Sequence, residues 1–353
     1  MNWPTVPYRP RDPQGPLPGI ALIGCGGISR HHLQAYVAAG YQVLALCDLD
    51  QQRAVDQRDK FYPQALATDD PAAALAVAGV AIADITTHPE PRVALIEQAL
   101  RSGKHVLSQK PFVLDLHVGQ RLADLAAEQG VHLAVNQNAR WAPHFSYLRT
   151  AAIGGLLGDL HAAHFAVHWD HSWTAGTPFE EIRHLILYDY AIHWFDLLAC
   201  LMQDQQPLRV HASFTRTRSQ PTKAALLGQV AVEYPAAQAT LVFDGHCPAG
   251  QHATAVVVGS EAIARSVGRG DNDHRVVITT PSGDFSPQLE GQWFDDGFHG
   301  AMGELMCAIQ ENREPAHSAN NNLRGLALCF AALQSAETNS PVTPGAVFDL
   351  PGR

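Results

Sequence analysis

The sequence predicts an α/β protein with two domains, the first built on a parallel sheet and the second on an open, mainly antiparallel sheet. The chain has 353 residues, which is more than one typical core organises. From residue 19 to about 139, short apolar runs alternate with helical stretches, a rhythm typical of right-handed crossovers. From residue 140 to 353, longer segments of alternating polarity replace that rhythm.

The elements of the first domain follow from apolar runs and from glycines. Helices are expected to stop at Gly40, Gly103 and Gly130, because glycine tolerates the left-handed conformation that ends a helix. The expected strands are 20–23, 42–47, 81–86, 105–108 and 131–135, and the clearest expected helices are 90–102 and 116–129.

The second domain is expected to place helices on one face of its sheet and to leave the other face free. The expected strands are 161–169, 210–217, 225–233, 239–245, 254–258 and 276–280, and the expected helices are 189–202, 297–311 and 321–338.

Residues 1–18 contain six prolines, at positions 4, 7, 10, 13, 16 and 18. Proline at this density favours extended chain over helix or central strand. The segment is interpreted as an arm. It is either a disordered tail, which is the commoner case, or an arm that lies across its own or a neighbouring subunit.

Composition narrows the functional classes. Lys and Arg number 24 against 34 Asp and Glu, so the formal net charge is −10, which disfavours a nucleic-acid partner. The six cysteines form no C-x-x-C pair, and a chain of this length needs no disulfides, so a cytoplasmic protein with reduced thiols is expected. The N-terminus has no apolar core of a secretory signal, and no apolar run is long enough for a membrane span.

A glycine-rich turn directly follows the first expected strand. Gly24 permits the tight turn, Gly26 allows a pyrophosphate to approach the backbone, and the small Ser29 allows the helix to pack near the strand. Asp48 ends the second strand, where a carboxylate accepts the ribose hydroxyls and repels a 2′-phosphate. This combination predicts a Rossmann domain that binds NAD in preference to NADP, and the alternative is an ordinary turn capped by an aspartate. The expected cofactor contacts here are Gly24, Gly26, Gly27, Ile28 and Asp48.

Further motifs make the chain resemble the Gfo/Idh/MocA family, named for glucose–fructose oxidoreductase and inositol dehydrogenase. Gln109–Lys110–Pro111 follows Gly103–Lys104–His105–Val106, as the Glu-Lys-Pro motif does in that family. Asp189 and His193 match its Asp-x-x-x-His motif, and Asn138 to Pro143 resembles its Asn-Arg-Arg-Phe-x-Pro junction. The resemblance runs from about residue 20 to 342.

The resemblance implies roles for individual residues. Lys110 is the implied catalytic lysine, His193 the general acid or base, and Asp189 the residue that orients substrate or tunes the pair. Positions i and i+4 of a helix share a face, which agrees with the implied roles of His193 and Asp189. The alternative is that Asp189 is a helix-terminal carboxylate and His193 a structural histidine. Further implied cofactor contacts are Thr87, Arg92, Gln109 and Asn138, and the expected substrate contacts are Lys110, Arg140, Trp169, His171, Asp189 and His193.

Three departures from the family pattern bear on the substrate. Gln109 replaces the usual Glu, which removes a carboxylate beside Lys110. Arg92 stands where many members have His near the nicotinamide. Residues 183–188 replace the glycines that often precede the Asp-x-x-x-His motif.

Histidines and aromatic residues gather around residues 161–173. His164 and His168 share one strand face while His161 points to the other, so polar contacts or substrate binding are favoured over a metal site. Trp169 and His171 follow that strand and are expected either to line a sugar site or to pack at the strand end.

The sequence therefore predicts an NAD-dependent dehydrogenase for a sugar, glycoside, polyol or inositol, with no nucleic-acid or membrane partner. A homodimer or homotetramer is expected to form through the open sheet face. Two alternatives remain: a redox-neutral lyase, hydrolase or epimerase that retains NAD, and a non-catalytic NAD-binding regulator.

Overall fold

The computed structural model describes residues 3–270 and 272–352, so the first two residues of the predicted arm lie outside it. The chain forms two compact units. The parallel-sheet unit comprises Arg9–Trp141 and Phe294–Leu323, and the mixed-sheet unit comprises Ala142–Trp293 with the residues up to Tyr8 and from Arg324 onward. The domain boundary expected after residue 139 remains a prediction. In residues 3–270 and 272–352, no helix combines the length and the apolar character that spanning a membrane requires.

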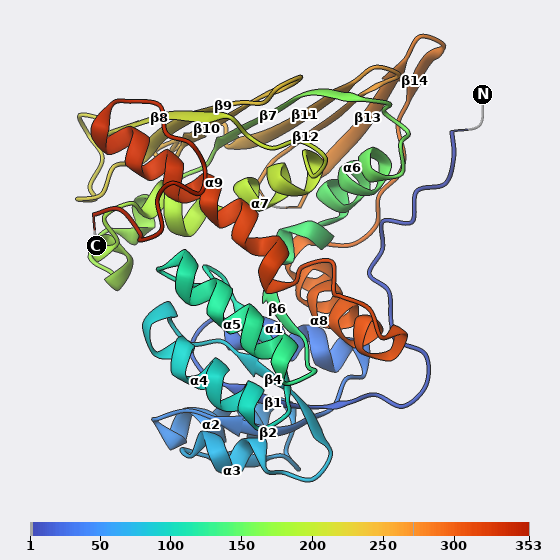
Figure 1. Cartoon of the computed structure of the whole chain (residues 1–353), viewed down its shortest axis with the longest axis vertical. Coiled ribbons are helices and arrows are strands. Elements are labelled where there is room, and N and C mark those ends of the chain that lie inside the picture. Colours follow the sequence, from blue (N-terminus) through green and yellow to red (C-terminus); the bar gives the residue numbers. More distant parts are fainter. Residues whose placement is uncertain (1–2, 271, 353) are drawn as a thin grey trace. The chain divides into compact units, whose positions relative to one another are not determined.

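The parallel-sheet unit holds six parallel strands in the order β3-β2-β1-β4-β5-β6, as expected for a Rossmann sheet (Figure 1). The strands are β1 (Gly19–Ile23), β2 (Val43–Cys47), β3 (Leu66–Thr68), β4 (Val80–Ile85), β5 (His105–Gln109) and β6 (Leu133–Asn136). The helices are α1 (Ser29–Ala39), α2 (Gln51–Phe61), α3 (Pro71–Leu75), α4 (Pro89–Arg101) and α5 (Leu116–Glu128), followed by a turn of 3₁₀-helix, η1 (Asn138–Trp141).

The strand register brings the predicted cofactor residues to one sheet edge. Ile23 of β1 pairs with Cys47 of β2 on one side and with Ile85 of β4 on the other. Because the three strands are parallel and end at the same level, the residues that follow them share the carboxyl edge, where open α/β sheets bind ligands. The elements expected from the sequence do not include β3, α3 or η1, each of which has too few residues to produce a periodic pattern.

The mixed-sheet unit holds eight strands in the order β14-β13-β12-β11-β7-β10-β9-β8. Only the central pair β7 and β10 is parallel, and every other pair is antiparallel. The strands are β7 (Leu160–His168), β8 (Arg209–Thr215), β9 (Leu227–Glu233), β10 (Gln238–Asp244), β11 (His252–Gly259), β12 (Ile263–Gly268), β13 (His274–Thr280) and β14 (Gly283–Phe285).

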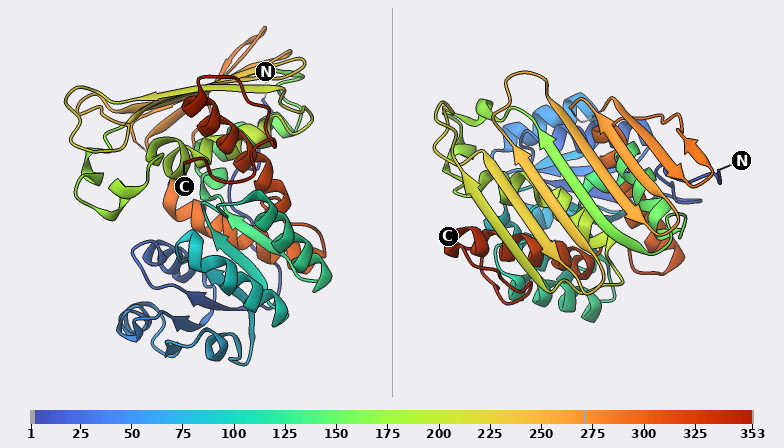
Figure 2. Two further views of the ribbon diagram at one scale, coloured as in Figure 1. Left: turned by 60° about the vertical axis from the view of Figure 1, so that its left-hand side comes forward. Right: turned by 90° about the horizontal axis from the view of Figure 1, so that it is seen from above.

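Side chains of this sheet alternate between a covered and an open face. Leu241 and Phe243 of β10 are fully buried, whereas Thr240 and Val242 between them are half-exposed. Helices α6 (Pro143–Ile153) and α7 (Ile192–Leu201) pack on the covered face, and Figure 2 shows the strands of the other face without a helix in front of them. This arrangement matches the predicted open sheet, although the sequence analysis missed α6, β12 and β14.

The helix expected over 189–202 is wrong at its start. A π-helical turn, η4 (Ile186–Tyr190), comes first, and the regular helix α7 begins only at Ile192. The two remaining helices start slightly earlier than expected, as α8 (Trp293–Glu311) and α9 (Ala319–Thr338).

The proline-rich arm forms no helix or strand over its described residues, and it packs on its own chain. In the mixed-sheet unit, the Tyr8 carbonyl accepts the Ser146 hydroxyl at 2.6 Å. In the parallel-sheet unit, Asp12 accepts hydrogen bonds from the Tyr41 hydroxyl and the His299 ring, both at 2.7 Å. These contacts support the interpretation as an arm across its own subunit, which stays a prediction.

A buried histidine of the mixed-sheet unit should make that unit acid-sensitive. His144 of α6 is 2% exposed and stacks on His274, with ring centroids 3.7 Å apart. Burial, with a smaller contribution from His274, holds the pKa of His144 well below its ordinary value of 6.5. The unfolded chain therefore takes up a proton there that the folded chain refuses, so stability present above about pH 6.5 is lost as the pH falls.

We expect His144→Phe, which keeps a stacking ring without a basic nitrogen, to reduce this acid sensitivity. The slope of unfolding free energy against pH should decrease by up to about 1.4 kcal/mol per pH unit below about pH 6. Urea unfolding at a series of pH values measures the slope, with exposed His161→Phe as the matched control. An unchanged slope in His144→Phe would contradict the assignment.

Candidate nucleotide and substrate sites

The turn after β1 is held by neighbouring strands through main-chain contacts. The Gly24 amide donates to the Cys47 carbonyl at 2.7 Å, and the Thr86 hydroxyl donates to the Gly24 carbonyl. Gly24 has φ of 102°, and a Cβ there would lie 2.9 Å from the Thr87 methyl group. Only glycine fits this position without strain, as the sequence predicts for the tight turn.

Asp48 sits where the sequence places it, and it caps the turn. Its Oδ2 accepts the Cys25 amide at 2.7 Å, and its Oδ1 accepts the Asp50 amide at 3.0 Å. Asp48 therefore does cap the turn, as the alternative interpretation from the sequence holds. This does not exclude a cofactor contact, because each carboxylate oxygen has a second lone pair for a hydroxyl donor.

Gly26 and Gly27 have a different reason to be glycine. Neither has a positive φ, and a Cβ at either position would meet no atom of the protein within 4 Å. Nothing in the described chain therefore requires glycine here, whereas a pyrophosphate that approaches the backbone does. The N-cap Ile28 of α1 supplies no side-chain hydrogen bond. The Ser29 and His31 amides donate to the carbonyls of Gly26 and Ile28 at 3.2 and 3.0 Å, so we expect an anion to meet the amides that precede them, those of residues 26–28. These residues fit a dinucleotide.

Arg92 of α4 holds the segment that carries Lys110. Its side chain is 1% exposed, and its guanidinium donates to the carbonyls of Thr87, Gln109 and Pro111. A buried guanidinium needs many acceptors, and the main chain provides them here. Arg92 therefore ties the loop after β4 to the end of β5, and a direct cofactor contact for Arg92 stays a prediction.

Gln109, the last residue of β5, points into the interior of the parallel-sheet unit. Its Oε1 accepts the Lys110 amide at 2.7 Å, and its Nε2 lies 3.2 Å from Nε2 of His32. Lys110 itself is half-buried. The structure thus places Lys110 directly after the strand end, as predicted, while the Gln109 amide faces a buried polar cluster.

Two further predicted residues lie in η1, after β6. Arg140 is 1% exposed and donates to the Ala316 carbonyl at 2.6 Å and to Asn321 Oδ1 at 2.7 Å. Asn138 is 4% exposed, and its backbone lies so close to α8 that a Cβ on Gly297 would meet the Asn138 carbonyl oxygen at 2.8 Å. The Arg140 side chain and the Asn138 backbone therefore pack against the 294–323 segment, and ligand contacts of both residues stay predictions.

Predicted substrate residues of the mixed-sheet unit meet in an aromatic cluster. The ring of Tyr190, next to Asp189, lies 4.0 Å from the His171 ring and 5.6 Å from the Trp169 ring. The His193 ring lies 5.8 Å from Trp293, which in turn lies 6.3 Å from Trp169. Tyr190, Trp194 and Trp293 were not among the residues expected from the sequence, although the aromatic pair 190 and 194 repeats the four-residue spacing of Asp189 and His193.

Buried polar atoms in this cluster fit a hydroxyl-bearing ligand. Trp169 Nε1 and His171 Nδ1 are shielded from solvent and meet no hydrogen-bond partner among the described residues. Burial lowers the pKa of His171 to about 4, against smaller opposite effects of Asp170 and Asp189. His171 is therefore neutral near pH 7, and it offers one donor and one acceptor to a ligand.

The π-helical turn η4, which contains Asp189, packs closely on the sheet. A Cβ on Gly228 would lie 2.9 Å from the Leu187 side chain, and one on Gly245 would lie 2.8 Å from Ile186. Glycine at these two positions therefore allows η4 to lie directly on β9 and on the end of β10.

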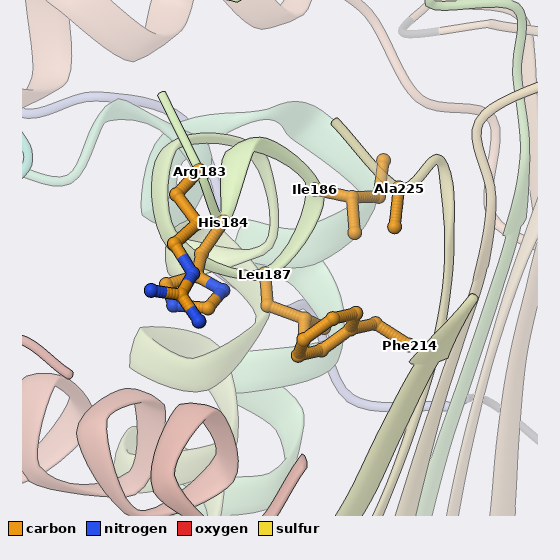
Figure 3. A pocket seen from close by; sticks show the side chains of 6 residues that line it. All are labelled: Arg183, His184, Ile186, Leu187, Phe214 and Ala225. Atoms are coloured by element: carbon orange, nitrogen blue, oxygen red, sulfur yellow. The ribbon is translucent and has the colours of Figure 1, made fainter. Parts of the chain in front are cut away.

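A shallow pocket at the start of η4 shows how the turn is anchored. Figure 3 shows Leu187 facing Phe214 of β8. Arg183 and His184 lie next to each other at the opposite end of the pocket from Phe214. Both basic residues lie within 3.0 Å of the Glu337 carboxylate of α9. Packing and charge thus hold the segment that replaces the family glycines.

Comparison with known proteins agrees with this geometry. Residues 19–137 match the sequence model of the Gfo/Idh/MocA oxidoreductase family with its NAD-binding Rossmann fold, and residues 145–265 match that of the family's C-terminal domain. The cofactor of this Rossmann domain is therefore NAD.

Individual relatives point the same way. The chain is 30% identical to D-apiose dehydrogenase of Paraburkholderia graminis over 56% of its own length and 53% of that protein. It is 25% identical to inositol 2-dehydrogenase of Rhizobium meliloti over 90% of its length and 96% of that protein. Alignments with the first relatives thus span about half of their length, or less.

The fold has counterparts among solved structures. An oxidoreductase from Agrobacterium radiobacter, solved with NAD+, L-tartaric acid and magnesium, superposes with a TM-score of 0.83 at 22% identity. The match covers 94% of this chain and 99% of that one. The two family matches together cover more than half of the sequence, in the order in which the family's two domains occur. The chain therefore belongs to the Gfo/Idh/MocA oxidoreductase family.

Proposed function

We propose that this protein is an NAD-dependent dehydrogenase that oxidises a hydroxyl group of a sugar, glycoside, polyol or inositol. The observation that carries the proposal is the pair Gly26 and Gly27, which the protein's own packing does not require and which a bound diphosphate does. The names of the relatives, D-apiose dehydrogenase and inositol 2-dehydrogenase, support the substrate class.

NAD supplies the hydride acceptor when bound. The protein's own task is to orient the substrate and to handle its proton. His193 or Lys110 accepts the proton of the substrate hydroxyl, and Asp189 orients the substrate or tunes the pair. Trp169 offers an indole N–H to a substrate oxygen, and His171 offers a neutral imidazole. Arg140 is a further proposed substrate contact.

The cofactor contacts that we propose are those predicted from the sequence. Gly24, Gly26, Gly27 and Ile28 present the turn and the start of α1 to the diphosphate, and Asp48 accepts the ribose hydroxyls. Thr87, Arg92, Gln109 and Asn138 complete the proposed set. The position of Asp48 beside the Cys25 amide supports its role, because it places a carboxylate directly at the turn.

We also propose that the protein is a cytoplasmic homodimer or homotetramer that associates through the open sheet face. Half-exposed or exposed apolar side chains of that face support this, among them Val242 of β10, Val256 of β11 and Val267 of β12. None of the six cysteines forms a disulfide, in keeping with a reducing compartment.

A pair of glycine variants separates the two roles of the turn. Gly26→Ala should leave the unfolding free energy almost unchanged and weaken NAD binding about tenfold or more, because the added methyl group occupies the approach of the diphosphate. Gly24→Ala should lower the unfolding free energy by about 1–3 kcal/mol, because of its positive φ and close contacts. Calorimetric titration with NAD and thermal unfolding measure both effects. Full NAD affinity in Gly26→Ala would contradict the proposed diphosphate site.

The choice between NAD and NADP should depend on Asp48. In Asp48→Ser, the loss of a negative charge facing a 2′-phosphate should lower the preference for NAD over NADP by about tenfold. The matched control is Asp50→Ser, which removes the same charge from the exposed N-cap of α2 and should leave the preference unchanged. Binding titrations with both dinucleotides measure the preference. Equal effects of the two variants would mean that Asp48 acts only through the net charge of the protein and not through a contact with the ribose.

The proton acceptor is tested with a panel of sugars, polyols, glycosides and inositols, followed by NADH absorbance. We expect stoichiometric NADH release with at least one substrate, and a loss of about a hundredfold or more in kcat for His193→Ala or Lys110→Met with NAD binding retained. Exposed His161→Ala serves as the control and should keep wild-type kcat. Turnover without net NADH would point instead to a redox-neutral reaction, and full activity in both His193→Ala and Lys110→Met would overturn the assignment of the proton acceptor.

A further inference from the structure

A buried polar cluster lies beneath the strand end that carries Lys110. It consists of His32 and Tyr36 of α1, Asp84 of β4, Gln109 of β5 and Asn136 of β6. Gln109 is 5% exposed, and the other four have no exposed surface. The ring of Phe298 closes one side, 4.5 Å from the His32 ring. A buried polar atom without a partner is costly, so the hydrogen bonds within the cluster decide how its side chains are oriented. Two of its oxygens, Oδ1 of Asp84 and Oδ1 of Asn136, meet no partner among the described residues.

The orientation of the Gln109 amide is fixed by the main chain. The Lys110 N–H can only donate, and it points to Oε1 of Gln109 at 2.7 Å. The other end of the amide, the NH₂ group, therefore faces Nε2 of His32 at 3.2 Å. A flipped amide would place two donors, the NH₂ group and the Lys110 N–H, against each other.

This orientation decides where the His32 proton lies. Nε2 of His32 must accept the Gln109 NH₂ group, and the Asn136 Nδ2 atom at 3.1 Å approaches the same nitrogen. A proton on Nε2 would meet two donors. Nδ1 lies 2.8 Å from Oδ2 of Asp84, a carboxylate that only accepts, and the Tyr36 hydroxyl donates to the same oxygen at 2.7 Å. The proton therefore belongs on Nδ1.

We propose that His32 is a positioning residue for the catalytic lysine: a neutral imidazole, protonated on Nδ1, whose Nε2 holds the Gln109 amide and thereby the backbone of Lys110. The part concerning the lysine rests on the proposed function. The chain of contacts runs from Asp84 through His32 and Gln109 to the Lys110 N–H, and each link joins one donor to one acceptor.

Glutamine at position 109, where the family usually has glutamate, then has a physical consequence. A glutamate at this position would accept both the Lys110 N–H and a proton on Nε2 of His32. His32 would then hold two protons between two carboxylates, those of Asp84 and residue 109. Glutamine supplies an NH₂ group instead, so it selects the neutral ring. The substitution thus changes the charge state of the cluster, while residue 109 still joins the Lys110 N–H to Nε2 of His32.

Nitrogen NMR of the full chain with ¹⁵N-labelled histidine tests the charge state directly. The His32 signals are identified by their loss in His32→Gln. At pH 7 the wild-type protein should show one protonated nitrogen, Nδ1, and one bare nitrogen, Nε2. In Gln109→Glu both nitrogens should be protonated at the same pH. The control Gln120→Glu makes the same change on the exposed face of α5 and should leave the His32 signals unmoved. A doubly protonated His32 in the wild-type protein, or a ring protonated only on Nε2, would overturn the proposal.

The effect on Lys110 has its own measurement. In His32→Leu the amide hydrogen of Lys110 should exchange with solvent about tenfold faster or more, because its acceptor is no longer held. His32→Gln should restore slow exchange, since its side-chain oxygen can accept the Gln109 NH₂ group. Unchanged exchange in folded His32→Leu would refute the positioning role.

Activity then links the cluster to catalysis. kcat should fall about tenfold in His32→Leu and recover in His32→Gln, with the NAD dissociation constant within about twofold of wild type. A fall in NAD affinity instead of kcat would mean that His32 only supports the cofactor turn. A wild-type protein inactive on every substrate would refute the dehydrogenase function, and the NMR and exchange results would still decide the role of His32.

Discussion

One carboxylate–amide contact organises the parallel-sheet unit. Oδ2 of Asp48 accepts the Cys25 N–H at 2.7 Å and so ties the end of β2 to the turn after β1. The turn has this shape because Gly24 adopts a positive φ and donates its amide to Cys47, while Thr86 holds its carbonyl from the other side. Three adjacent strand ends thus fix one short loop. The glycines that follow it and the N-cap of α1 then present their main-chain N–H groups in a fixed direction.

Buried polar side chains extend this rigidity to Lys110. The Arg92 guanidinium donates hydrogen bonds to carbonyls at the ends of β4 and β5. The Gln109 side chain is held by His32 in the buried polar cluster. An unsatisfied buried donor is costly, so each of these groups specifies one local arrangement of the backbone. In the mixed-sheet unit, glycines at 228 and 245 allow η4, which carries Asp189, to pack closely on the sheet.

Much of the fold could be predicted because its signals are local. The apolar runs of β1 and β2, the glycine turn and the terminal aspartate lie within 30 residues of one another, and each has a short-range physical cause. The mixed sheet was predictable from alternating polarity, which fails for short strands such as β14. The π-helical turn was missed because Asp189 and His193 have the same spacing in a regular helix as across η4 and α7.

The burial of the predicted ligand residues could not be predicted from the sequence. Arg92 and Arg140 are charged, and such side chains are usually exposed, so motif reasoning assigns them to a ligand. Their actual partners are carbonyls and an amide contributed by residues up to 181 positions away in the sequence. Likewise, the burial of Trp169 Nε1 and His171 Nδ1 depends on tertiary packing with Tyr190 and its neighbours, which the local sequence does not reveal.

The central claim is that the turn after β1 receives a dinucleotide through its main chain. Amide hydrogen exchange of the whole protein, measured with and without NAD, tests it most directly. Exchange at Gly26, Gly27 and Ile28 should slow in the presence of NAD, while the amide of Cys25, already bonded to Asp48, should change little. If NAD leaves exchange at residues 26–28 unaltered, or slows it only elsewhere in the protein, the account of this turn is contradicted.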